Sequence, residues 1–297
     1  MTSSPAPPLQ RIDRSHWRWR LRRFGLHDPE GLVGSVALLL VIMAAFLAGV
    51  LAPMDPERQN IALRLLPPGT ETSGYRFWLG TDELGRDLLS RVIFGTRVSL
   101  SVGFGAVLLS AAFGTAVGIL SGYYGGSWDD LLMRVTDVQL AFPSILLSLA
   151  IVAILGAGLR NLVLVLAIAG WVGYARIARS RVLGVRQLEF IEAAHALGAP
   201  DRRILWRHVL PNVLPSMFVI ASFSLGGMIT SEAALTFLGL GVPANIPSWG
   251  GMLTSGAQYV SVAWWLATFP GLAIMLTVLA ANLLGDWLRD ASDPRLR

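Results

Sequence analysis

The side chains of this sequence that could do chemistry are few and form no catalytic pattern. The four histidines, His16, His27, His195 and His208, lie outside any HExxH spacing and have no paired acid that would suggest a metal site. The chain has no cysteine, which excludes disulfides and thiolate metal sites. All 24 basic residues are arginines, whereas a Walker A loop needs a lysine to reach the β- and γ-phosphates. We therefore expect no enzyme, no metal site and no cofactor in this chain. Any ATP that the process uses must be bound by another polypeptide.

One short stretch between apolar segments is instead rich in charge, "FIEAAHALGAPDRRILWRHVLPN", which runs from Phe190 to Asn212. Residues 189–197 favour a helix, and Gly198 stands where a helix prefers a left-handed residue after its end. Pro200 suits the first position of a second helix, with Asp201 in its first turn, and Pro211 is expected to end that helix. Connections between elements usually have about 4–6 residues, so this longer, structured segment is typical of a docking element for a partner.

The elements around that stretch are apolar. Hydrophobic residues make up 54% of the chain and charged residues only 14%, against about 25% in a soluble domain. Six apolar blocks approach the length of about 20 residues that a membrane helix needs. They are Leu32–Leu51, Val98–Leu120, Leu140–Gly158, Leu159–Ala178, Asn212–Ser231 and Val262–Leu284. The sequence therefore predicts an all-α integral membrane protein with six transmembrane helices, in which residues 32–297 form one domain.

The arginines predict the orientation of these helices. If the N-terminus is cytoplasmic, most arginines lie in cytoplasmic segments, including the loop from Arg179 to Pro211. The outer segments then keep only Arg58, Arg64, Arg76, Arg86, Arg91, Arg97 and Arg160. The positive-inside rule favours this arrangement, with both termini in the cytoplasm.

Two segments outside the apolar blocks have patterns of their own. Residues 1–31 contain "HWRWRLRRF", a basic and aromatic run typical of attachment to an anionic membrane surface rather than to nucleic acid. Residues 52–97 form the predicted outer segment. Within it, "GTDELGRDLLSRVIFG" places leucines on one helical face and Asp87 and Arg91 on the other. This pattern predicts an amphipathic helix lying along the outer interface.

A few residues inside the apolar blocks call for an explanation. Pro143 is expected to kink the third helix. Four glycines in the second block are expected to let helices pack closely: Gly103, Gly105, Gly114 and Gly118. Glu232 follows the fifth block and could lie on a substrate path or tie the outer end of the fifth helix to the segment "GTDELGRD". The second interpretation is favoured.

The stretch "EAAHALGAPDRRILWRHVLP" resembles the EAA loop of permeases from ABC importers. Its matching residues are Glu192, Ala193, Ala194, Gly198, Leu210 and Pro211, and His208 stands at the isoleucine position, as is common in the peptide/nickel branch. Three further stretches resemble the dipeptide and oligopeptide "C" type of that branch. They are "WLGTDELGRDLLSRVIFGTRVSL", "EAALTFLGLGVPANIPSWGGML" and "FPGLAIMLTVLAANLLGDWLRDASDPRLR". The resemblance covers nearly everything from Leu32 onward.

This resemblance implies a type I ABC-importer permease fold in the cytoplasmic (inner) membrane of a prokaryote. It implies a second, similar permease subunit, two cytoplasmic ATPase subunits that bind ATP and Mg, and an extracytoplasmic solute-binding protein. The EAA loop would then be the coupling helix that fits a groove on an ATPase. Its expected coupling residues are the six matching ones together with Asp201, Arg202, Arg203 and His208.

Other functions are compatible with parts of the sequence. Dipeptides or oligopeptides are the expected cargo, with nickel chelates, glutathione-like peptides and opines as alternatives. A secondary transporter driven by an ion gradient usually has internal repeats and intramembrane acids. Glu232 is the only acid with a claim to that position here, and no repeat is evident. A scaffold without transport would leave the EAA loop unexplained.

Overall fold

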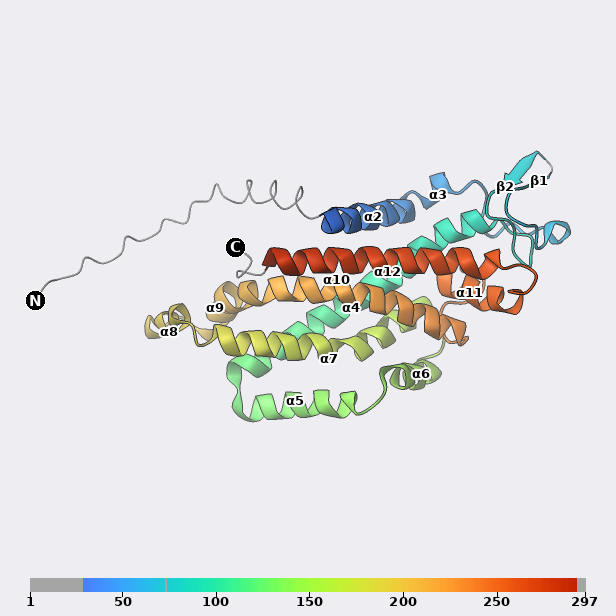
Figure 1. The fold of residues 1–297 in the computed structure, drawn as a ribbon. Coiled ribbons are helices and arrows are strands. Elements are labelled where there is room, and N and C mark those ends of the chain that lie inside the picture. The colour runs from blue at the N-terminus through green and yellow to red at the C-terminus, as the bar shows by residue number, and fades with distance from the viewer. Residues whose placement is uncertain (1–28, 73, 293–297) are drawn as a thin grey trace, which may run out of the picture.

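The computed structural model describes residues 29–72 and 74–292, which form an elongated bundle of long helices (Figure 1). The basic N-terminal segment lies outside the described residues, except for its last three residues, which begin the first helix. Five helices are long and apolar enough to cross a membrane, and a bent pair of shorter helices provides a sixth crossing if it is counted as one span. This agrees with six apolar blocks in an all-α protein.

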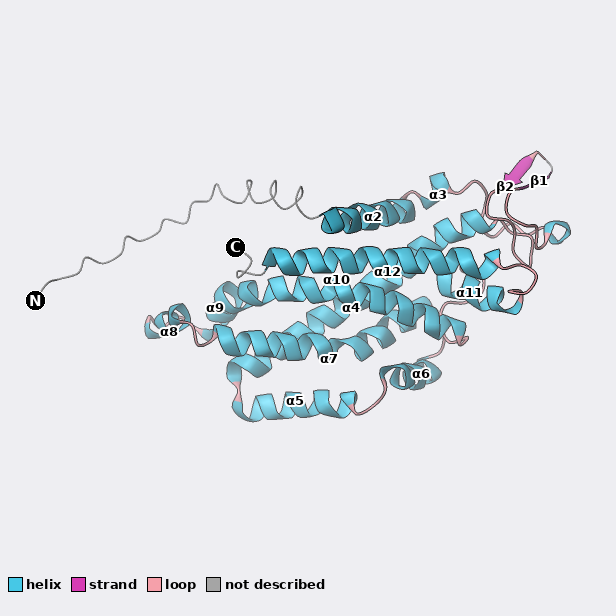
Figure 2. Cartoon of the chain, in the orientation of Figure 1, coloured by secondary structure: helices cyan, strands magenta, loops and turns pink. Residues whose placement is uncertain are grey.

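The long helices follow the predicted blocks but most extend beyond them. Their bounds are α2 (Pro29–Phe46), α4 (Leu88–Tyr124), α7 (Leu159–Val185), α10 (Leu210–Phe237) and α12 (Trp265–Ser292). The 37 residues of α4 span about 55 Å at 1.5 Å per residue, well over the ~30 Å of a bilayer core. The short helices are α3 (Ala48–Leu51), η1 (Ile61–Leu63), α8 (Glu189–Ala196), α9 (Asp201–Ile204) and α11 (Trp249–Gln258). A hairpin of β1 (Thr70–Thr72) and β2 (Tyr75–Phe77) is the one sheet among the described residues (Figure 2).

The third apolar block does not form one helix. Most of it forms α6 (Ser144–Leu155), which has only 12 residues, while its first residue, Leu140, ends α5 (Gly126–Leu140). The two helices meet at 90° around Pro143, and the sixth crossing therefore includes α5, which the sequence placed before the block. Proline has no N–H and disfavours helical geometry in the residue before it, and here the chain breaks rather than kinks. The side chain of Gln139 stabilises the end of α5. Its Nε2 donates to Ile168 O at 2.6 Å, and its Oε1 accepts from Trp171 Nε1 at 2.8 Å.

The predicted amphipathic helix at the outer interface is wrong. The helix α4 begins at Leu88 and runs straight into the bundle. Asp87 caps it by accepting from the N–H of Ser90 at 2.8 Å, and burial raises the pKa of the Asp87 carboxyl. Arg91, only 5% exposed, points inward, where it lies 3.4 Å from Asp82 and donates to Pro56 O at 3.3 Å. Asp87 and Arg91, which were expected to meet water, thus belong to a buried polar cluster that joins the outer segment to α4.

The charged loop between α7 and α10 comprises residues 186–209, a shorter segment than the predicted Arg179 to Pro211. Pro211 does not end a helix, because α9 continues into α10 through a π-helical turn, η2 (Leu205–Val209). In this turn the Leu210 N–H donates to Leu205 O, five residues back, and the Asn212 side chain donates to His208 O at 2.6 Å. The wider turn accommodates a proline that lacks an N–H and would crowd an α-helical carbonyl.

Glycines of α4 let α7 and α10 pack closely against it. A Cβ at Gly114 or Gly118 would fall on the backbone oxygens of Trp171 or Ala175. Gly103 and Gly105 likewise lie against Ile229 and Val163. The prediction that these four glycines serve packing is confirmed.

Candidate functional site

The charged loop lies at one end of the bundle, opposite the end that carries β1, β2 and α11 (Figure 1). Its two helices are joined by a Schellman turn. Gly198 has a left-handed φ of +74°, as predicted, and its N–H donates to His195 O at 2.9 Å. The Ala199 N–H donates to Ala194 O at 3.1 Å, which completes the motif. No atom lies within 4 Å of a Cβ built at Gly198, so only backbone conformation requires glycine there.

Two isoleucines hold the loop against the bundle. Ile191 of α8 and Ile204 of α9 are 1% and 0% exposed. They belong to one apolar cluster with Ile119 of α4 and with Ala178 and Val182 of α7. The burial of Ile191 was not predicted, because a single buried position in an eight-residue helix gives almost no periodic signal. The loop therefore packs against the ends of α4 and α7.

The predicted coupling residues fall on the outer surface of this anchored loop. Glu192, Ala193, Asp201, Arg202, Arg203 and Pro211 are exposed, whereas Ala194, His208 and Leu210 are half-buried. Two apolar side chains that were not predicted share this surface. Leu197 is 88% exposed and Trp206 is 67% exposed. Exposed apolar groups beside arginines are typical of a protein-binding surface.

Glu232 lies near the other end of the bundle, within α10, and is 0% exposed. Its Oε2 accepts from Ser99 Oγ of α4 at 3.1 Å, and its Oε1 accepts from Thr236 Oγ1 at 3.0 Å. Ser99 Oγ in turn accepts from the Trp249 N–H at the start of α11, at 3.3 Å. Glu232 thus ties α10 to α4 and α11. The predicted tie to "GTDELGRD" is not found, since its partners lie in these other elements.

Comparison with known proteins identifies the family of this chain. Residues 114–297 match the family described as binding-protein-dependent transport system inner membrane component, and residues 15–68 match the N-terminal TM domain of oligopeptide transport permease C. The chain belongs to this family of transport permeases, which are multi-span inner-membrane subunits of ABC transporters.

Several relatives resemble the chain along nearly its whole length. A glutathione transport system permease, GsiD of Pectobacterium atrosepticum, is 44% identical over 96% of this chain and 93% of its own. A dipeptide transport system permease, DppC of Alkalihalophilus pseudofirmus, is 42% identical over 99% of this chain and 95% of its own. A di/tripeptide transport system permease, DppC of Pseudomonas aeruginosa, is 44% identical over 91% and 90%.

The fold is also found in a solved structure. The inward-facing MetNI methionine ABC transporter contains a chain that matches with a TM-score of 0.57 and 19% identity, over 69% of this chain and 98% of that one. At this identity the likeness concerns the fold alone. That fold is the type I ABC-importer permease fold.

Proposed function

We propose that this protein is a permease subunit of an ATP-driven importer that moves dipeptides or oligopeptides inward across the cytoplasmic membrane of a prokaryote. The observation that carries the proposal is the likeness along almost the whole chain to permeases named for dipeptides, di/tripeptides and glutathione. Glutathione is itself a small peptide, so import of glutathione-like peptides is the second candidate. The subunit itself is non-catalytic, and partner ATPases bind the ATP and Mg.

The charged loop is the proposed contact with one of two ATPase subunits. Its exposed Leu197 and Trp206, beside Arg202 and Arg203, suit a groove with an apolar floor and an acidic rim. The loop is continuous with α10 through η2, so a displacement by the ATPase would be carried directly into a helix that crosses the membrane.

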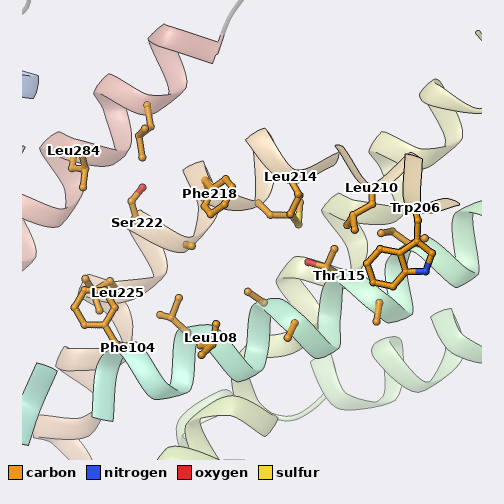
Figure 3. A pocket seen from close by; sticks show the side chains of 18 of the residues that line it. Phe104, Leu108, Thr115, Trp206, Leu210, Leu214, Phe218, Ser222, Leu225 and Leu284 are labelled. Atoms are coloured by element: carbon orange, nitrogen blue, oxygen red, sulfur yellow. The ribbon is translucent and has the colours of Figure 1, made fainter. Parts of the chain in front are cut away.

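A groove along α4 and α10 is the proposed face for a second, similar permease. Side chains of both helices point into it, including Phe104 and Leu108 from α4 and Phe218 from α10 (Figure 3). The groove has a volume of about 730 Å³. Alanines and the small polar residues Thr115 and Ser222 also line it. Small residues let a helix from a partner approach closely.

A solute-binding protein would deliver cargo at the end that carries β1 and β2.

The proposed orientation puts both termini and the charged loop in the cytoplasm. Leu197→Cys is then expected to resist an impermeant thiol reagent added to intact cells, and to react once the cells are opened. Glu71→Cys, exposed in β1 at the opposite end, is the matched control and should react in intact cells. The parent chain has no cysteine that would interfere. Labelling of position 197 in intact cells would contradict the orientation.

Gly198 offers the test of the coupling role. Gly198→Val should strain the left-handed corner by roughly 1–2 kcal/mol and misdirect the loop. We expect peptide uptake to fall on the order of tenfold, with the helices still folded and with ATP hydrolysis no longer matched to transport. Glu192→Lys should act similarly by reversing charge at the ATPase contact. The measurements are peptide uptake and ATP hydrolysis by the assembled transporter in proteoliposomes.

Gly198→Asn is the matched control, because asparagine tolerates left-handed backbone better than other residues with a side chain. It should retain most of the uptake. Normal uptake in Gly198→Val and in Glu192→Lys would remove the coupling role from the charged loop.

A further inference from the structure

The last turn of α4 is a junction where several elements are joined by polar side chains. Ser121 Oγ donates to Asp129 of α5, and Arg179 of α7 donates to the same carboxylate at 2.6 and 2.5 Å. Arg186, which follows α7, donates to the carbonyl oxygen of Gly122 at 3.1 Å. Hydrogen bonds between charged partners are among the stronger ones in proteins. The ends of α4, α5 and α7 therefore form one connected unit.

Tyr123, in the same turn, reaches from this unit to both helices of the charged loop. Its hydroxyl donates to Asp201 Oδ1, at the first position of α9, over 2.8 Å. The hydroxyl oxygen of Tyr123 also lies 3.5 Å from His195 Nε2, in the last turn of α8. The rings of Tyr123 and His195 are stacked, with 23° between their planes and 6.3 Å between their centres. One side chain of α4 thus contacts the loop on either side of the Gly198 corner.

We propose that Tyr123 is a positioning residue that fixes the register between the charged loop and α4, so that a movement of the loop is transmitted to α4. The inference rests on the proposed function. The loop is joined covalently to α7 and α10, and these helices follow its movement through the chain itself. Arg186, the first residue of the loop, holds only the junction with α7 to α4. The two helices of the loop contact α4 through side chains, namely the apolar packing of Ile119 and the polar contacts of Tyr123.

These two kinds of contact differ in what they can transmit. Apolar packing is non-directional, so Ile119 can slide against the loop at little cost. A hydrogen bond weakens steeply when its length or angle changes, so the Tyr123–Asp201 bond resists such sliding. Because α4 and α10 form the walls of the groove, its shape during transport depends on their moving together. Tyr123 couples α4 to the motion that α10 receives through the chain.

Tyr123→Phe tests the inference, because it removes the hydroxyl and keeps the ring. Tyr124→Phe is the matched control, since its ring is 52% exposed and lies edge-on to Tyr123. The complete transporter, with both permeases, the ATPases and the binding protein, is reconstituted in proteoliposomes with a dipeptide. Tyr123→Phe should lower the peptide moved per ATP hydrolysed by roughly tenfold, the scale expected for a hydrogen bond to a charged group. Tyr124→Phe should match the parent, and both variants should assemble fully.

A double-mutant cycle with Asp201→Ala shows whether the two groups act through each other. Tyr123→Phe should have no further effect in the Asp201→Ala background. If the loss of transport in the double variant equals the product of the losses in the two single variants, the two groups act independently and the pairing is overturned. A transport ratio for Tyr123→Phe equal to that of Tyr124→Phe would overturn the positioning role, and so would failure of Tyr123→Phe to assemble, which would show a structural role only. A parent transporter that hydrolyses ATP but moves no peptide would contradict the proposed function itself, before any variant is compared.

Discussion

Gly118→Leu is expected to abolish formation of a stable permease. A Cβ at this position would fall on the carbonyl oxygen of Ala175 and lie 2.6 Å from Ala178 Cβ. The obstacle is backbone, which a change of rotamer cannot relieve, so α4 and α7 would have to separate along their contact. Even modest overpacking costs about 1–3 kcal/mol, and a whole leucine at a backbone contact exceeds that range. We expect the amount of complex co-purified from membranes to fall more than tenfold.

The matched control for this change is Gly173→Leu, on the helix that faces Gly118. No atom lies within 4 Å of a Cβ built at Gly173, so the same gain in side-chain volume meets open space. Its complex should be recovered at nearly the parent level. Equal recovery of the two variants would show that the close contact between α4 and α7 is not needed for folding.

Glu232→Ala is expected to destabilise strongly the end of the bundle where α10 meets α4 and α11. The loss of stability in Glu232→Gln should be intermediate. Ser99 and Thr236 each accept a backbone N–H, from Trp249 and Val242, and therefore direct their own protons at Glu232. Two acceptor oxygens are needed there, and the carboxylate group has both. Glutamine offers one acceptor and alanine offers none. Each buried hydroxyl left without an acceptor costs about 1–3 kcal/mol.

The measurement is the temperature at which half of the purified complex unfolds, together with uptake normalised to assembled complex. The temperature should fall in the order parent, Glu232→Gln, Glu232→Ala, with normalised uptake retained by Glu232→Gln. Glu71→Gln, at an exposed position in β1, controls for the loss of one negative charge. The substrate-path hypothesis makes the opposite prediction, in which uptake of a peptide with a free amino terminus falls sharply while stability is unchanged.

Local features of the sequence were sufficient to predict much of this protein. Apolar length alone located the five long membrane-crossing helices, because a bilayer selects for about 20 residues without charge. The left-handed turn at Gly198 followed from helix-end chemistry that involves only its neighbours in the chain. The packing role of Gly118 followed from spacing on one helix face. Each of these properties depends on residues within one or two turns of each other.

Other properties depended on partners that are distant in the sequence, and only the tertiary structure decided them. The helical pattern assigned Arg91 to a water-facing surface. Its buried partners, Asp82 and Pro56, are brought to it only by the fold of the outer segment. Glu232 is bound by Ser99, 133 residues away. Tyr123 contacts Asp201 across 78 residues. A buried polar side chain needs a hydrogen-bond partner. Which partner it finds depends on which helices pack together, and the sequence near that side chain does not contain this information.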